Sequence, residues 1–266
     1  MDSLLVPFIV SFIVVVLVAL LLRPLAIRLE LVDVPGGRKT HKGHVPLVGG
    51  IAMLFGFVAG LLALNFPLHN YRALLAGITV LAFAGLLDDF HELSARAKFV
   101  AQLIAALLMV VWGHNKLFTL GHLFFGKAIL LQYHLSVPVT VFAILSIINA
   151  INMLDGIDGL AGGVVLIELL LLFALAFHAG QALDASILGV LASSVAAFLC
   201  LNYRLPGRRR AIVFMGDVGS MFLGFALVWF CVSLSQVAQS SLRPISFLFV
   251  MALPLLDTAS VMLRRM

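Results

Sequence analysis

Charged side chains are scarce in this sequence of 266 residues: Asp, Glu, Lys and Arg together make up 11%, and hydrophobic residues 63%. An ordinary soluble domain carries about a quarter charged residues. The mean hydropathy of +1.17 therefore excludes that class, and it also excludes a disordered chain. Cysteine is scarce too, and the two present, Cys200 and Cys231, both lie in apolar runs. This argues against a disulfide scaffold and against a zinc site made of thiolates.

Long apolar runs are what the sequence has in abundance. A membrane-spanning helix needs roughly 20 apolar residues, whereas the strands of an outer-membrane barrel alternate over about ten. We therefore predict an all-α fold, a polytopic membrane helix bundle with about nine transmembrane helices, in a single domain over 1–266. The segment 113–134 has room for a short hairpin. The apolar runs cover 4–22, 45–68, 73–87, 99–112, 135–154, 159–177, 185–203, 218–238 and 244–263.

The basic residues set the expected orientation, because Lys and Arg are retained on the cytoplasmic side of a membrane. If the nine apolar runs cross the bilayer one after another, 13 of the 17 basic residues lie on one side. The other side has Arg72, Lys116, Lys127 and Arg243. The N-terminus is thus expected outside and the C-terminus in the cytoplasm. Nine of the 12 acidic residues also fall near cytoplasmic ends, although no orientation rule requires it. This gathering of carboxylates indicates a functional site.

Asp88 and Asp89 end an apolar run in the sequence GLLDDF. Two adjacent carboxylates at a low-dielectric boundary repel each other when both are ionised, which is unfavourable. One of them is therefore expected to bind a proton, or a cation is expected nearby. A single Asp in this place would be interpreted as a polar stop at the end of a helix. The pair, with Lys98 ten residues from Asp88, favours metal binding or acid–base chemistry.

Asn149, Asn152, Asp155 and Asp158 recur every three residues in the sequence NAINMLDGIDGL. At this spacing the first three share one face of a helix, and the two glycines then let the backbone turn. Oxygen-bearing side chains in such a row suit a hard cation or the hydrogen-bonding edge of a nucleoside. Asn residues that only hold helices together would explain Asn149 or Asn152 singly, but not the whole series.

Asp217 lies between glycines in the sequence FMGDVGS, immediately before the eighth run. Glycines let backbone N–H groups approach a ligand, and a helix N-terminus attracts phosphate, so an Asp here suits a cation that bridges to that phosphate. Taken alone, a helix N-cap explains this Asp better. A separate anion-binding patch is predicted in the first cytoplasmic loop from Arg38, Lys39, His41, Lys42 and His44.

Together these features predict an aqueous-facing site of carboxylates and cations at the inner surface of the bilayer. Carboxylates that bind Mg²⁺, next to basic residues that bind phosphate, are typical of phosphoryl transfer. A multispan scaffold suits this chemistry when one reactant is itself in the membrane. The alternative is a secondary transporter of a metal ion or an anionic metabolite. Transporters place their acids near the midplane, where this chain has only Glu168.

Four motifs, in this order, extend the interpretation: GRKTHKGHVPLVGG at 37–50, DD at 88–89, NAINMLDGIDGL at 149–160 and FMGDVGS at 214–220. In these motifs the chain resembles the polyprenyl-phosphate N-acetylaminosugar-1-phosphate transferases. The resemblance runs from the first apolar run to the last residue. The first loop is more similar to the branch that transfers GlcNAc-1-phosphate than to the peptidoglycan branch.

The resemblance implies transfer of HexNAc-1-phosphate, in particular GlcNAc-1-phosphate, from a UDP-N-acetylhexosamine to undecaprenyl phosphate. UMP is released and a lipid-linked glycan is begun. The implied cofactor is Mg²⁺, with Mn²⁺ as a substitute. The implied location is the bacterial inner membrane, with the active site on the cytoplasmic face. The implied partners are the two substrates, membrane lipids and a second copy in a homodimer; nucleic acid is not among them.

The same resemblance assigns roles to single residues. Asp88, Asp89 and Asp217 are implied as catalytic, with Asp88 as the base or activator for the lipid phosphate. Asp217, Asn152 and Asp89 are the implied metal ligands. The implied substrate-binding residues are Lys39, His41, Lys98, Asn149, Asp155 and Asp158.

Family members usually continue past the segment matched by 254–265 into a further cytoplasmic loop with a His-x-His pattern and further helices. The resemblance therefore predicts that 1–266 is a fragment that lacks this last loop and the terminal helices. We expect the full-length parent to be active and such a fragment to have weak activity or none.

Overall fold

The computed structural model describes residues 2–33, 45–124, 127–204, 210–236 and 244–265, and it is helical with two small hairpins. A 3₁₀ turn, η1 (His69–Tyr71), precedes α3, and a π-helical turn, η2 (Leu108–Trp112), continues α4. The α-helices are α1 (Asp2–Arg28), α2 (Gly49–Leu62), α3 (Arg72–His91), α4 (Ala95–Leu107), α5 (Tyr133–Leu154), α6 (Leu160–His178), α7 (Ala182–Asn202), α8 (Gly216–Ser235), α9 (Pro244–Val250) and α10 (Ala252–Arg265).

A helix lies in each of the nine predicted apolar runs, which confirms the all-α polytopic membrane bundle. Among the described residues, seven helices are long and apolar enough to span a membrane. The other two runs differ from expectation. α2 has only 14 residues, or roughly 21 Å of helix. The last run is broken into α9 and α10, which meet at an angle of 65°. The orientation of the termini stays a prediction.

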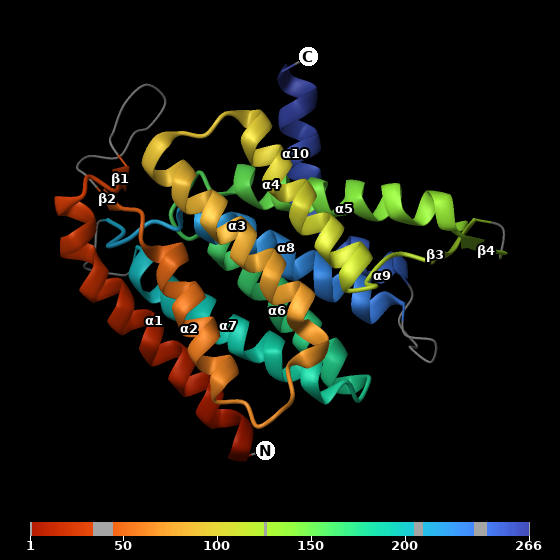
Figure 1. Cartoon of the computed structure of the whole chain (residues 1–266), viewed down its shortest axis with the longest axis horizontal. Helices are drawn as coiled ribbons and strands as arrows, with labels where there is room; N and C mark the ends of the chain where they lie inside the picture. Colours follow the sequence, from red (N-terminus) through yellow and green to blue (C-terminus); the bar gives the residue numbers. More distant parts are fainter. Residues whose placement is uncertain (1, 34–44, 125–126, 205–209, 237–243, 266) are drawn as a thin grey trace.

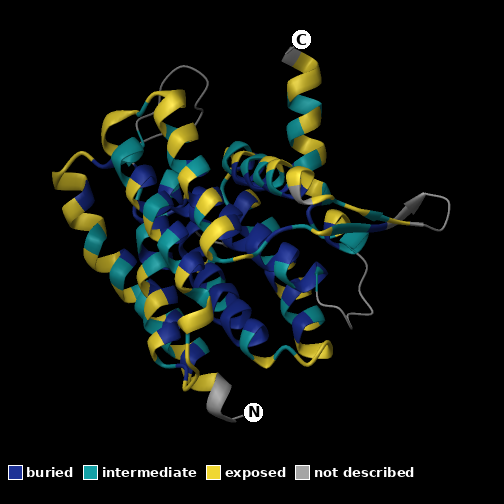
Figure 2. Ribbon diagram, turned by 45° about the vertical axis from the view of Figure 1, so that its right-hand side comes forward, coloured by how far each residue is buried: buried dark blue, intermediate teal, exposed yellow. Residues whose placement is uncertain are grey.

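The core of the bundle is organised around α8. Helices α3, α5, α2 and α6 all pack against it (Figure 1). In its most apolar stretch of 18 residues, 94% is buried. Buried residues fill the centre of the molecule, and exposed residues lie along its outer helices (Figure 2). Many of these exposed residues are large and apolar. α1 is the clearest example of such an outer helix, since only 22% of its most apolar stretch of 18 residues is buried. Such an apolar outer surface is what lipid covers in a membrane.

The start of α2 is fastened to the segment that leads into α8. The Gly49 N–H donates to the Phe214 carbonyl at 2.8 Å, and the Gly50 N–H donates to the Met215 carbonyl at 2.8 Å. The two helices approach so closely that a Cβ added to Gly50 would lie 2.2 Å from the Gly219 nitrogen. This contact fixes the backbone immediately before Asp217.

Both small sheets are antiparallel hairpins. β1 (Val32–Asp33) pairs with β2 (Val45–Pro46), and so brackets residues 34–44, which lie outside the described part of the chain. β3 (Thr119–Phe124) pairs with β4 (Lys127–Leu130) and projects from one edge of the bundle (Figure 1). The second pair is the hairpin for which 113–134 had room.

Glu168, the mid-membrane acid, points into the bundle from α6. It is 2% exposed, and neither carboxylate oxygen has a hydrogen-bond partner among the described residues. A buried polar group without a partner is destabilising by about 1–3 kcal/mol. We therefore expect Glu168→Leu to raise the thermal unfolding temperature of the purified protein in detergent.

The matched control is Glu168→Gln, which keeps a polar side chain of the same length in the same place. It should stabilise the protein less than Glu168→Leu. A lower unfolding temperature for the leucine variant would show that the carboxyl group has a stabilising partner.

Candidate active site

The Asp pair at the end of α3 divides between two partners. The Asp88 Oδ2 lies 2.6 Å from the Lys98 ammonium on α4, and its Oδ1 accepts a hydrogen bond from the Leu93 N–H at 2.7 Å. A tight connection makes this possible, because Glu92 has the left-handed φ of 46° and Ser94 caps α4 by accepting from the Ala97 N–H. Lys98 is thereby brought back over the end of α3.

Asp217 contributes the second carboxylate around Lys98. Its Oδ2 lies 2.9 Å from the Lys98 Nζ, so a single ammonium group is shared by carboxylates from α3 and α8. The Oδ1 of Asp217 accepts from the Asn152 amide at 3.0 Å, and the same amide donates to the Ser220 hydroxyl at 3.0 Å. Four predicted site residues, on four helices, therefore meet at one point.

Asp89 contacts the backbone rather than the ammonium group. Its Oδ1 accepts from the Asp217 N–H at 2.9 Å, at the first turn of α8, where a negative charge is favourable. Gly216, with φ of +69°, lies against the same carboxylate, and a Cβ there would be 2.6 Å from the Asp89 Oδ2. That Oδ2 is buried and has no hydrogen-bond partner in the described part of the chain.

Asn149 lies one turn before Asn152 but has a different partner. Its amide donates to the Gln102 Oε1 on α4 at 2.8 Å and to the Leu145 carbonyl at 2.8 Å. Gln102 is buried and was not expected at the site. A sequence signal for it existed, because Gln102 is four residues after Lys98 and so lies on the same face of α4.

The two acids that follow α5 lie at the edge of the cluster. Asp158 accepts from the Arg204 Nε at 2.7 Å. Asp155 is exposed at one side, but the protein around it removes much of the water that would stabilise its charged form. The negative charges of Asp217, Asp158 and Asp33 disfavour a further negative charge at Asp155. These effects raise the pKa of Asp155 to about 7.

Asn202 joins two loops at the site, a role that no sequence motif predicts. Its Oδ1 accepts from the Gly159 N–H at 2.7 Å, where φ is +79°, and its amide donates to the Val213 carbonyl at 3.0 Å. The side chain is 5% exposed. It therefore holds the loop after α5 against the segment that leads to Asp217.

Two predicted binding residues, Lys39 and His41, lie outside the described residues. Among those that are described, no group of three or more His, Cys, Asp or Glu side chains is arranged to hold a metal ion. The donor chemistry nevertheless fits Mg²⁺, which is usually bound through one or two carboxylates together with water and substrate phosphates. Asp88 and Asp217 share the ammonium group of Lys98, so their carboxylates already lie around one positive charge. The Oδ2 of Asp89, which has no partner among the described residues, is a further oxygen of the kind that Mg²⁺ prefers.

The fold and the site define a multi-pass membrane protein with a cluster of carboxylates, one lysine and one asparagine at one end of its bundle. The family model of glycosyl transferase family 4 matches residues 71–235, a range that contains every described member of this cluster. The chain belongs to glycosyl transferase family 4.

Curated relatives are similar over most of the chain. It is 34% identical to the undecaprenyl-phosphate alpha-N-acetylglucosaminyl 1-phosphate transferase of Yersinia pestis, over 92% of this chain and 66% of the relative. The enzyme of the same name from Haemophilus influenzae is 36% identical over 96% of this chain and 72% of the relative. That from Escherichia coli K12 is 32% identical, over 92% and 66%. The chain thus spans about two thirds of the length of these relatives.

Proposed function

We propose that this protein transfers HexNAc-1-phosphate, in particular GlcNAc-1-phosphate, from a UDP-sugar to undecaprenyl phosphate and releases UMP. The observation that carries the proposal is the sharing of one ammonium group, that of Lys98, by Asp88 and Asp217 from separate helices. Relatives whose names state this acceptor and this sugar phosphate support the choice of substrates.

The reaction needs two anions to approach each other. An oxygen of the lipid phosphate forms a bond to the sugar-attached phosphorus, and the bond from that phosphorus to the UMP oxygen breaks. A positive charge held in place lowers the repulsion between the two phosphate groups. Lys98 is suited to this role because it is part-exposed at the site while two carboxylates hold its position.

Asp88 is the proposed base for a protonated lipid phosphate, since it lies beside the ammonium group that would attract that phosphate. One-step attack is the simplest route that these groups allow. Asp217, with Asn152 and Asp89, would hold Mg²⁺, or Mn²⁺ in its place. A bound divalent ion would neutralise the charge on the diphosphate.

The remaining residues are proposed to bind the donor. Asn149, Asp155 and Asp158 lie toward the nucleotide in this proposal, and Lys39, His41 and Lys98 serve the diphosphate. The active site would face the cytoplasm from the inner membrane, the face at which UDP-sugars are found and at which the basic residues gather.

Membranes that contain the full-length parent implied by the resemblance, incubated with radiolabelled UDP-GlcNAc, undecaprenyl phosphate and Mg²⁺, test the proposal; residues 1–266 alone are expected to form little product or none. We expect a labelled product that butanol extracts, and we expect EDTA to reduce labelling to background because the diphosphate charge is no longer neutralised. Excess Mg²⁺ added after EDTA should restore the product. A series of UDP-N-acetylhexosamines then identifies the sugar.

Membranes without the protein are the control for endogenous activity. The proposal is wrong if no UDP-N-acetylhexosamine labels the lipid although the protein is inserted. Accumulation of a charged solute in sealed vesicles under the same conditions would instead support the transporter alternative.

A further inference from the structure

A second polar region lies at the opposite end of α3 from the Asp pair. α3 has 20 residues, so its ends are roughly 30 Å apart, which matches the hydrocarbon thickness of a bilayer. The Asp pair is at its C-terminal end, and a cavity of about 430 Å³ lies at its N-terminal end. The two features therefore lie at opposite faces of the membrane.

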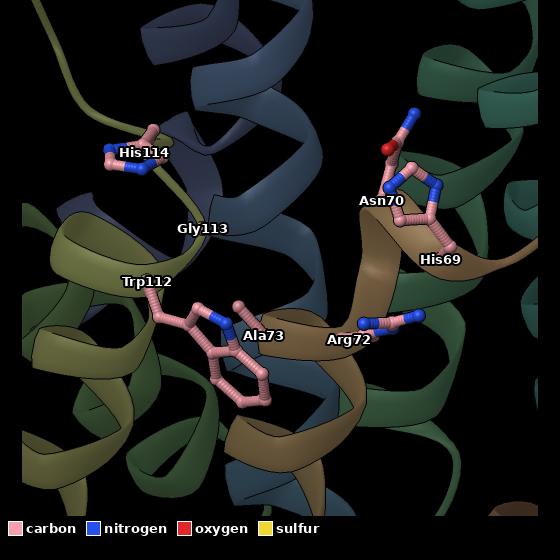
Figure 3. A pocket seen from close by; sticks show the side chains of 7 residues that line it. All are labelled: His69, Asn70, Arg72, Ala73, Trp112, Gly113 and His114. Carbon is pink, nitrogen blue, oxygen red and sulfur yellow. The ribbon is translucent and has the colours of Figure 1, made fainter.

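Two elements supply the walls of this cavity. One group of residues comes from η1 and the start of α3, and the other from Trp112 at the end of η2 and the two residues after it; Figure 3 shows the two groups on opposite sides, with Ala73 between. Within the described residues, the polar members of the lining make no side-chain hydrogen bond or ion pair. The lining comprises His69, Asn70, Arg72, Ala73, Trp112, Gly113 and His114.

An adjoining cavity of about 310 Å³ adds to the positive character. It shares Asn70, Gly113 and His114 with the first, and it reaches Lys116. The lining of this cavity also includes one acid, Asp184, which accepts a hydrogen bond from the Tyr71 hydroxyl at 2.5 Å, so the two basic residues outnumber the described acid. Arg72 and Lys116 are two of only four basic residues predicted for this side of the membrane. Half of the basic residues predicted for this side of the membrane therefore lie at the two adjoining cavities.

The π-helical turn gives the cavity its second wall. The Gly113 N–H donates to the Leu108 carbonyl, five residues earlier, and such turns recur at functional sites. Gly113 also lies close to α8, since a Cβ there would be 2.7 Å from the Trp229 ring. Val111 and Trp112 remain 63% and 53% exposed. An exposed indole at a helix end is typical of the boundary between hydrocarbon and headgroups.

We propose that this cavity binds the phosphate group of an anionic phospholipid at the face opposite the active site. Arg72 supplies a permanent charge and planar donors, His69 and Asn70 supply further donors on the same side, and His114 supplies one from the opposite side. The position of Trp112 favours a lipid phosphate over a free one, because acyl chains can lie along the apolar surface beside it. The inference is independent of the proposed transferase reaction.

Native mass spectrometry of the purified full chain tests this, with phosphatidylglycerol, phosphatidylcholine and inorganic phosphate titrated separately. Both headgroups carry a phosphate, but the choline of phosphatidylcholine adds a positive charge that Arg72 repels. We therefore expect phosphatidylglycerol to bind roughly tenfold more tightly than phosphatidylcholine. The double variant Arg72→Gln/His114→Gln should lose that preference. His178→Gln, an exposed histidine at the outer end of α6 and outside the cavity, should keep it.

Asp217→Asn should also keep the preference, so failure of the transferase reaction leaves this result unaffected. Equal binding of the two lipids, or an unchanged preference in the double variant, would overturn the proposal. Competition by millimolar inorganic phosphate as strong as that by the lipid would overturn the choice of a lipid ligand. Circular dichroism of the double variant verifies that it is folded.

Discussion

Asp217→Asn should reduce transferase activity by at least about 100-fold while the protein still inserts into membranes. Loss of one preorganised electrostatic contact in an active site typically has an effect of this size. The substitution removes the charge that Lys98 and the proposed metal share, yet it keeps the volume of the side chain and an oxygen that can accept from Asn152. The ion pair of Lys98 with Asp88 at 2.6 Å is untouched, so the helix ends stay together.

The measurement is the rate of labelled lipid formation at saturating UDP-GlcNAc, normalised to inserted protein. Glu168→Gln is the matched control, because it makes the same carboxylate-to-amide change at a buried site on another part of the bundle. Its rate should equal that of the wild type. A rate for Asp217→Asn above about a tenth of wild type would mean that another residue supplies the essential negative charge.

For the adjacent acids Asp88 and Asp89, the sequence predicts their location but not their partners. The motif predicted that Asp88 and Asp89 belong to one site, and in the structure both contact the cluster around Lys98 and Asp217. It could not predict that they act on different partners. Neighbouring residues point about 100° apart around a helix, so Asp88 contacts the Lys98 ammonium while Asp89 contacts the backbone of α8.

The row after Asn149 shows the same limit. A spacing of three predicted Asn149, Asn152 and Asp155 on one face of a helix. The first two lie in α5, but the helix ends at the residue before Asp155, so Asp155 is not part of that helical face. The partners of Asn149 and Asn152 come from α4 and α8, and packing between helices decides which neighbour each one meets. Asp158 likewise pairs with Arg204, which belongs to none of the predicted motifs.

The two runs that are not continuous spans have local physical causes. The apolar run 45–68 begins with β2 and the junction with α8, so its helix starts only at Gly49, and it ends at Leu62. In the last run, Pro254 has no N–H to donate to the carbonyl four residues earlier, which is that of Val250, the last residue of α9. Apolar composition predicts burial in the membrane, but it does not determine where a helix starts or bends.

Gly50→Ala should destabilise the protein by about 3 kcal/mol and also lower its activity. The new Cβ would lie 2.2 Å from the Gly219 nitrogen and 2.6 Å from the Met215 carbonyl oxygen. Because both are backbone atoms, no side-chain rotation relieves the overlap, and α2 must move away from α8. That movement shifts the residues just before Asp217, and a displacement of about 1 Å can reduce a rate about 100-fold.

Gly163→Ala is the matched control, since this glycine is also helical but a Cβ there meets nothing within 4 Å. Its greater helix propensity should leave the protein equally stable or more stable by up to about 1 kcal/mol. Thermal unfolding in detergent and the labelling rate measure both variants. Unfolding at the same temperature for Gly50→Ala and Gly163→Ala would contradict a backbone-to-backbone contact of α2 with α8. A stable but inactive Gly50→Ala protein would instead mean that the contact serves chiefly to position Asp217.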